Sequence, residues 1–206
     1  MQLLLVGSDI HEAISRAAQI VRAGGVVAYP TDTLYALAAD PRNGEAIERL
    51  FAIKGRSGDQ PIPLIASDIA QVEEQGGELG DLGRRLAVAF WPGPLTLVIP
   101  ARPAITHGVH AGTGRVAVRV PAEEVARALA SACGAPITST SANLSRAPAP
   151  RLDEDVRAEL GDRIDAILDG GPTPGGLPST IVDATGAIPA LVRAGVVPWE
   201  RVLECL

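Results

Sequence analysis

The chain has 206 residues, of which 47% are hydrophobic and 3% aromatic, and its formal net charge is −6. This acidic balance excludes a protein that holds nucleic acid through a general basic field. Two cysteines are too few for a disulfide framework, and every apolar run is interrupted before the roughly 18 residues of a membrane span. The amino terminus lacks the basic region and cleavage site of a signal peptide. We therefore expect no membrane partner, a cytoplasmic location and a single domain over residues 1–206.

The first quarter of the chain is predicted to alternate strands and helices. Asp9, with Glu12 three residues later, is typical of a capping box at a helix start, and Gly24-Gly25 is typical of a helix end. The apolar pattern predicts a strand at 3–6, a helix at 9–23, a buried strand at 26–29 and a helix that ends at 54–56.

A polar turn follows the strand at 26–29. Pro30 cannot donate to a strand ladder, so the strand ends there and releases the side chains of Thr31, Asp32 and Thr33. Ligands of open α/β sheets bind just beyond strand ends. We expect this turn to form one wall of a binding site, with Asp32 bracing the loop or a cation.

The middle of the chain contains several proline-bounded elements. The prolines of the strand at 61–66 indicate a sheet edge or a strand start, and the Gly- and Glu-rich stretch at 73–81 indicates a surface connection. A helix at 84–90 is broken by Trp91-Pro92-Gly93-Pro94, where we expect Trp91 to fill a hydrophobic gap. A strand at 95–99 follows.

Arg119 lies inside an alternating strand, and its side chain points away from Val116, Val118 and Val120. An arginine in such a place needs a partner. The partner is either an internal carboxylate or an anionic ligand held bidentately in a cleft, and the strand alone favours neither.

The last third combines hydroxyl-rich and glycine-rich segments. The run at 137–143 carries four hydroxyls and an amide, which is typical of a polar loop or a helix cap. The loop at 169–180 has residues that expose backbone N–H groups or fix a bend. Other predicted elements are helices at 123–133, 152–160 and 198–206 and strands at 164–168, 181–182 and 191–193.

Several chemistries are excluded by the motifs. Neither familiar phosphate-binding glycine loop is present. His107 and His110 lie in a Gly-rich segment without a nearby cysteine, so we expect a solvated loop there and no protein-held metal. Ser141 lacks the G-x-S-x-G context of a hydrolase nucleophile. What remains is a set of cationic, hydroxyl and amide groups near strand ends that favours a phosphate or carboxylate site: Thr31, Lys54, Arg56, Arg119, Ser139, Ser141, Asn143, Ser179 and Arg193.

Four motifs occur in a specific order along most of the chain. They are Tyr29-Pro30-Thr31-Asp32-Thr33, Lys54-Gly55-Arg56, Trp91-Pro92-Gly93-Pro94-Leu95-Thr96 and Ser141-Ala142-Asn143. With this order the sequence resembles the YrdC-like threonylcarbamoyl-AMP synthase family from about residue 23 to residue 195. Many members have a histidine near Ile65, which this sequence lacks, as do members with a P-L-P-L-type strand.

The resemblance implies a single-domain α/β fold: a twisted open mixed sheet with flanking helices and a concave basic groove. It implies an L-threonylcarbamoyladenylate synthase, a nucleotidyltransferase that joins L-threonine, bicarbonate or CO₂ and ATP with release of pyrophosphate, for threonylcarbamoyladenosine modification of tRNA. By matching position, the threonine-binding residues would be Thr31, Arg119, Ser139 and Ser179, and the nucleotide-binding residues Lys54, Arg56, Ser141, Asn143 and Arg193.

The matching residues include no obvious general base, so we expect catalysis by positioning and by cations, with Lys54 and Arg56 as the catalytic residues on a solvated groove wall. Mg²⁺ would be carried by the nucleotide. Further expected partners are tRNA and downstream threonylcarbamoyl-transferase proteins. The alternatives are an RNA-binding module that uses the same groove, and an enzyme that forms a carbamoyl adenylate for another acceptor.

Overall fold

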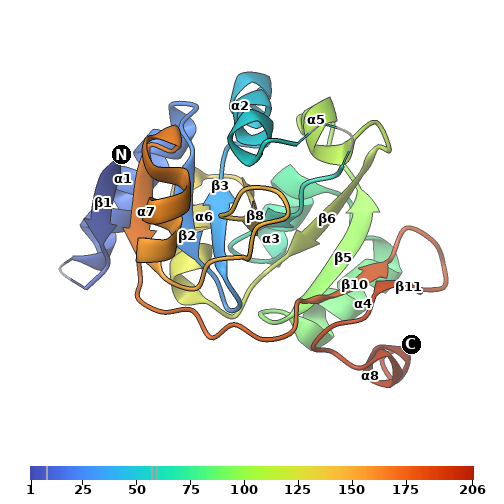
Figure 1. The fold of residues 1–206 in the computed structure, drawn as a ribbon. Coiled ribbons are helices and arrows are strands. Elements are labelled where there is room, and N and C mark those ends of the chain that lie inside the picture. The colour runs from blue at the N-terminus through green and yellow to red at the C-terminus, as the bar shows by residue number, and fades with distance from the viewer. Residues whose placement is uncertain (8, 57, 59) are drawn as a thin grey trace.

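The structure is a computed structural model that describes residues 1–206 except residues 8, 57 and 59 (Figure 1). The strands are β1 (Gln2–Leu5), β2 (Val27–Pro30), β3 (Tyr35–Ala38), β4 (Leu64–Ile65), β5 (Leu95–Pro100), β6 (Arg115–Arg119), β7 (Ile137–Thr138), β8 (Thr140–Ser141), β9 (Ala166–Asp169), β10 (Thr180–Asp183) and β11 (Ala190–Arg193). The helices are α1 (Ile10–Arg22), α2 (Gly44–Lys54), α3 (Ile69–Gln71), α4 (Gly80–Phe90), α5 (His107–His110), α6 (Glu124–Cys133), α7 (Asp153–Leu160) and α8 (Trp199–Leu203), with a π-helical segment at Val72–Gly76 and a 3₁₀ turn at Gly161–Arg163.

The described strands form two mixed sheets. One has the order β1-β9-β2-β3-β8 and the other β11-β10-β5-β6-β4-β7. Figure 1 shows β1, β2 and β9 on the left with α1 and α7, and β5, β6, β10 and β11 on the right with α4. The predicted mixed α/β architecture with flanking helices is confirmed, with the strands shared between two sheets.

The segment at 137–141 joins the two sheets. β7 pairs with β4 in one sheet and β8 pairs with β3 in the other, so Ser139 lies at the junction. The Thr138 hydroxyl accepts from the N–H of Ala39 and donates to the carbonyl of Leu37, both at 2.8 Å. The prediction of a polar loop or helix cap here was wrong, because residues 137–138 and 140–141 form β7 and β8 and the Thr138 hydroxyl bonds to the backbone of Leu37 and Ala39.

Helix ends follow the sequence signals. The Asp9 carboxylate accepts from the N–H groups of His11 and Glu12, and α1 starts at the next residue. Helix α2 ends at Lys54 and is capped by Gly55, whose φ of 60° is the left-handed conformation that glycine adopts without strain. This stop places Lys54 and Arg56 at the point where the chain leaves the helix.

For the strand with prolines, the strand-start alternative is confirmed, because β4 lies between β6 and β7 and its prolines precede the two-residue strand. Two other expectations need correction. The stretch at 73–81 continues as the π-helical segment and opens α4 instead of forming a simple surface connection. The 107–110 segment forms α5 rather than a solvated loop, because Val109 is fully buried.

The described buried apolar residues form two cores, each made of helix and strand side chains. Buried faces of α1 and α6 pack on β2, β3 and β9, and the opposite core collects residues of α2, α4, β4, β5 and β6. Trp91 belongs to the second core, with 8% of its surface exposed and its indole N–H donating to the Leu95 carbonyl. The expected gap-filling role of Trp91 is therefore confirmed. None of the helices built from described residues has the length and apolar character of a membrane span.

Candidate functional site

Two neighbouring cavities contain the predicted site residues. The first, of about 380 Å³, is lined among others by Thr31, Arg56, Arg119, Ser139, Ser141, Ser179 and Arg193. The second, of about 670 Å³, is lined among others by Lys54, Arg56, Ser141 and Asn143. Arg56, Thr140 and Ser141 line both, so these three residues form the boundary between the cavities. Every predicted site residue thus lines at least one of the two cavities.

Thr31 closes the turn after β2. Its hydroxyl donates to the Leu34 carbonyl at 2.7 Å and accepts from the N–H groups of Thr33 and Leu34 at 3.2 Å. Only 3% of the residue is exposed. Thr31 therefore lines the first cavity while its hydroxyl maintains the shape of the turn.

Arg119 ends β6 in the first cavity and has an internal partner. Its Nη1 atom donates to both carboxylate oxygens of Asp32 at 2.7 Å, and Asp32 lies 87 residues earlier in the sequence. Asp32 thus braces a cation, as the sequence predicted. The internal carboxylate is the partner of Arg119 in this structure, and an anionic ligand in the cavity would share or replace it.

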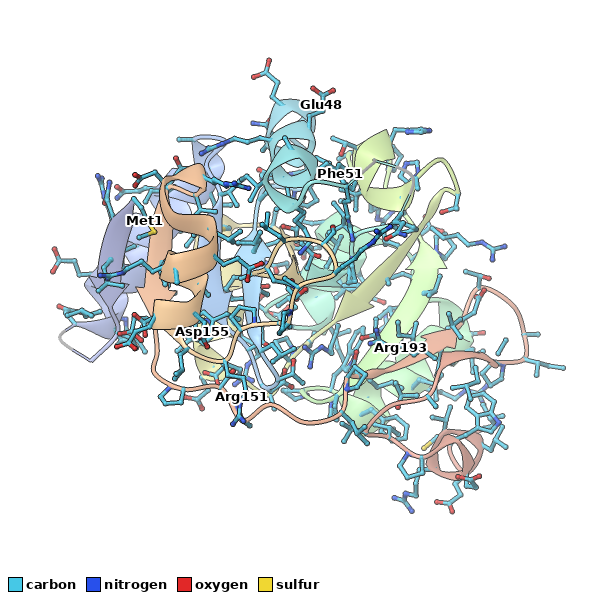
Figure 2. The ribbon with its side chains drawn as sticks, viewed as in Figure 1. Met1, Glu48, Phe51, Arg151, Asp155 and Arg193 are labelled. Atoms are coloured by element: carbon cyan, nitrogen blue, oxygen red, sulfur yellow. The ribbon has the colours of Figure 1, made fainter. Side chains whose placement is uncertain are left out.

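Ser179 and Arg193 form the opposite side of the first cavity. The Ser179 hydroxyl lies 2.8 Å from that of Thr96, and the Arg193 guanidinium donates to the Ser179 carbonyl at 2.8 Å. Burial and the charge of Arg119 lower the pKa of Arg193. Figure 2 shows Arg193 on β11, in the right half of the view. Arg119 and Arg193 line the same cavity, so an anion bound there would be attracted by both.

Lys54 lies in a different environment from the expected solvated wall. It is 4% exposed, and its Nζ donates to the carbonyl oxygens of Ser141 and Asn143. Burial and the charge of Arg56 lower the pKa of Lys54 to about 8, while Glu159 acts in the opposite direction. The prediction of an exposed lysine was wrong, because its side chain holds the S-x-N turn from beneath.

Arg56 stands at the boundary of the cavities. Its Cζ lies 5.2 Å from the centroid of the Phe51 ring, which fixes one face of the guanidinium by a cation–π contact. Phe51 extends from the lower end of α2 in Figure 2. Helix α2 thus supplies the aromatic support for the arginine that follows it.

The Ser141-Ala142-Asn143 segment forms a tight turn at the same boundary. The Ser141 hydroxyl donates to the Asn143 side-chain oxygen at 2.5 Å, and the Asn143 amide donates to the Ala147 carbonyl at 2.6 Å. From α7, the Glu159 carboxylate accepts from the Leu144 N–H at 2.7 Å. Side chains from three segments therefore fix the turn.

Some lining residues were missed by the sequence argument. Thr96 bonds Ser179, and its only signal was its place in the W-P-G-P-L-T motif. Tyr35 donates to the Gly171 carbonyl at 2.9 Å and ties β3 to the glycine-rich loop; burial raises its pKa. Ile65, the position at which the motif resemblance implied a histidine, is buried and lines the first cavity.

The lining chemistry favours anions. The first cavity contains Arg56, Arg119 and Arg193, and the described residues that line either cavity include no Asp or Glu. Among the described residues, no group of three or more His, Cys, Asp or Glu side chains could hold a metal ion.

Comparison with known proteins decides the family. Residues 19–195 match the family model of the Sua5, YciO and YrdC proteins, which carries the description "Telomere recombination". The chain belongs to the Sua5/YciO/YrdC family. This confirms the resemblance found in the motifs.

Relatives and solved structures agree with that membership. The chain is 40% identical over 190 residues to a Bacillus subtilis protein named threonylcarbamoyl-AMP synthase, a match that covers 92% of this chain and 55% of the relative. The P. abyssi Sua5 structure described as complexed with L-threonine has a TM-score of 0.91 and 35% identity, covering 100% of this chain and 60% of that chain. E. coli YciO has a TM-score of 0.82 and 28% identity, covering 96% of both chains.

The first two of these family members are considerably longer. The chain spans about half the length of the B. subtilis relative and 60% of the P. abyssi protein. The names of these relatives favour an enzyme over the RNA-binding module.

Proposed function

We propose that this chain is an L-threonylcarbamoyladenylate synthase, a nucleotidyltransferase that forms threonylcarbamoyl-AMP from L-threonine, bicarbonate or CO₂ and ATP. The observation that carries the proposal is the pair of cavities that meet at Arg56 and Ser141. One cavity has an arginine pair and hydroxyls suited to an amino acid, and the other has the cations suited to phosphates. The P. abyssi relative, described as complexed with L-threonine, supports threonine as a substrate.

The first cavity would bind threonine. Arg119 would hold the carboxylate, and the hydroxyl groups of Ser139 and Ser179 would contact the polar groups of the substrate. The resemblance implied a nucleotide-binding role for Arg193, but Arg193 lines the first cavity and not the second, so we propose that it supports Arg119 instead. Thr31 would contribute the wall, since its hydroxyl is engaged in the turn. The amine of threonine would add to CO₂, forming a carbamate and releasing a proton.

The chemical step would occur at the boundary between the cavities. A carbamate oxygen would attack the α-phosphorus of ATP as the bond from that phosphorus to the β-phosphate oxygen breaks, and pyrophosphate would leave in line. Arg56 at the boundary and Lys54 beneath the Ser141–Asn143 turn would stabilise the developing negative charge. Catalysis would depend on position and electrostatics.

Mg²⁺ fits this scheme as a companion of the nucleotide. Phosphate oxygens and water are the ligands that Mg²⁺ commonly keeps in nucleotide sites, and it would neutralise phosphate charge there. The product is an activated carbamoyl group, so tRNA and the proteins that transfer the group to its adenosine are the proposed downstream partners.

The test measures pyrophosphate release from ATP with and without L-threonine and bicarbonate, with the adduct identified by mass spectrometry. We expect release that requires both co-substrates. Arg119→Met should raise the threonine KM strongly while ATP binding stays close to that of the wild type, because Arg119 lines only the first cavity. Pyrophosphate release that is independent of threonine would refute the proposal.

A further inference from the structure

Arg146 has a backbone conformation that suits glycine. Its φ is 76°, and among the described residues the other positive values belong to glycines and Ala111. A side chain in the left-handed region costs on the order of 1 kcal/mol, which a glycine at this position would avoid. A strained residue beside a site points to a functional reason for its side chain.

Bonds on both sides of Arg146 impose this conformation. The Asn143 amide donates to the Ala147 carbonyl, and the Ala147 N–H donates to the Leu144 carbonyl at 3.1 Å. The Ser145 N–H donates to the Lys54 carbonyl at 3.0 Å. The turn that Lys54 and Asn143 stabilise therefore has Arg146 at its exposed corner.

Arg146 completes a cationic wall. It lines the second cavity together with Lys54 and Arg56, and the described residues that line this cavity include no carboxylate. The exposed guanidinium of Arg146 has no ion pair or hydrogen bond within the described part of the chain. A polyanion in this cavity would thus gain an additional cation from Arg146 without breaking an existing pair.

The geometry of phosphoryl transfer identifies the phosphates concerned. In an in-line displacement the attacking and leaving oxygens lie on opposite sides of the phosphorus. If the carbamate attacks from the first cavity, the leaving group lies in the second, beyond Arg56 and Ser141. We propose that Arg146 binds the outer two phosphates of ATP, and the pyrophosphate that they become. This inference depends on the proposed function for its orientation.

The experiment compares Arg146→Gly, Arg146→Ala and Arg146→Lys with the wild type in calorimetric titrations with inorganic pyrophosphate, ATP, AMP and L-threonine. Loss of the guanidinium should weaken pyrophosphate and ATP binding about five-fold in the Gly and Ala variants, near the upper end for an exposed ion pair. Arg146→Lys should retain most of the affinity. AMP and L-threonine should bind as they do to the wild type.

Two controls separate charge from backbone strain. Arg157→Ala, on the exposed face of α7 and outside both cavities, changes the net charge equally and should leave pyrophosphate binding unaltered. Arg146→Gly should be at least as stable as the wild type in urea, while Arg146→Ala keeps the strained conformation. Equal weakening in both variants despite different stability would assign the effect to the guanidinium.

Pyrophosphate binding that is unchanged in Arg146→Gly and Arg146→Ala, absent from the wild type, or weakened no more than AMP binding would overturn this assignment. The titrations need no turnover. A wild-type protein that binds pyrophosphate through Arg146 but forms no threonine adduct would therefore refute the proposed function and leave the Arg146 site standing.

Discussion

The Nζ atom of Lys54 lies 2.9 Å from the carbonyl oxygen of Asn143, which places a buried cation beneath the turn that separates the two cavities. Lys54→Met would leave the carbonyls of Ser141 and Asn143 without this donor. We expect the free energy of unfolding to fall by about 1–3 kcal/mol at pH 7, the cost of unsatisfied buried acceptors less the cost of burying an ammonium group. Urea denaturation measures the change.

Arg56→Met provides the matched control, because Arg56 is half-buried and lies against Phe51 rather than beneath the turn. It should lose ATP binding with a smaller loss of stability. Equal stability of wild type and Lys54→Met would show that the turn does not depend on the lysine.

The lowered pKa of Lys54 predicts that stability and ATP affinity change in opposite directions as the pH rises above 8. Burial lowers that pKa to about 8 from 10.5, so between these pH values the unfolded chain binds more protons than the folded one. The free energy of unfolding of the wild type should therefore rise with pH in this interval relative to Lys54→Met. ATP affinity should fall by up to about tenfold per pH unit above pH 8, because the ammonium form attracts phosphate.

Denaturation and ATP titrations between pH 7.5 and 9.5 would measure both slopes. Wild-type curves that run parallel to those of Lys54→Met would contradict the lowered pKa.

Local order in this protein could be predicted from the sequence, whereas long-range partners could not. Periodicity and caps predicted α1, α2 and β2 because those signals act within a few residues. The pairing of Arg119 with Asp32 joins positions 87 residues apart, so the strand pattern left the partner of Arg119 open. For the same reason, the residues adjacent to Lys54 along the chain did not indicate that its ammonium group bonds to the distant carbonyls of Ser141 and Asn143.

The sequence predicted which residues line the site better than it predicted the bonds among them. The motif resemblance selected residues that all line the two cavities, since motif order reflects the shared fold. It missed Thr96 and Arg146, whose roles depend on what they face in three dimensions. The residue pattern at 137–143 indicated a loop or a helix cap, although the segment forms β7 and β8 and its Thr138 hydroxyl bonds across the junction of the two sheets.

Asp32→Asn tests whether Arg119 also serves the substrate. The variant removes the charge opposite a guanidinium of which 8% of the side-chain surface is exposed, so we expect the free energy of unfolding to fall by about 1–3 kcal/mol. Saturating L-threonine should then raise the Tm of Asp32→Asn more than that of the wild type, because the substrate carboxylate replaces the missing charge. Thermal denaturation with and without L-threonine measures the difference.

Asp40→Asn is the control for this comparison. Asp40 pairs with Arg42 outside both cavities, so its loss should leave the threonine-induced shift in Tm unaltered. A shift in Asp32→Asn that equals the wild-type shift would mean that Arg119 serves Asp32 alone.

Thr31→Val removes the hydroxyl that closes the turn after β2. Four hydrogen bonds would be lost: to the Leu34 carbonyl, from the N–H groups of Thr33 and Leu34, and with the Thr33 hydroxyl. We expect the free energy of unfolding to fall by about 1–2 kcal/mol and the threonine KM to rise with it. Thr31→Ser should restore both, and steady-state kinetics with urea denaturation would measure them. A raised KM at full stability would instead assign the hydroxyl to the substrate.

Gly195→Ala tests how closely the chain must pack behind Ser179. A Cβ at position 195 would lie 2.3 Å from the Pro178 carbonyl oxygen and 2.5 Å from the Thr180 nitrogen, so the backbone that carries Ser179 would have to move. We expect a loss of about 1–3 kcal/mol in the free energy of unfolding and a larger rise in the threonine KM than in the ATP KM, because Ser179 lines only the first cavity. Gly186→Ala is the matched control, since its nearest contact would be at 3.7 Å. Equal KM changes for both substrates would show that the effect spreads beyond the first cavity.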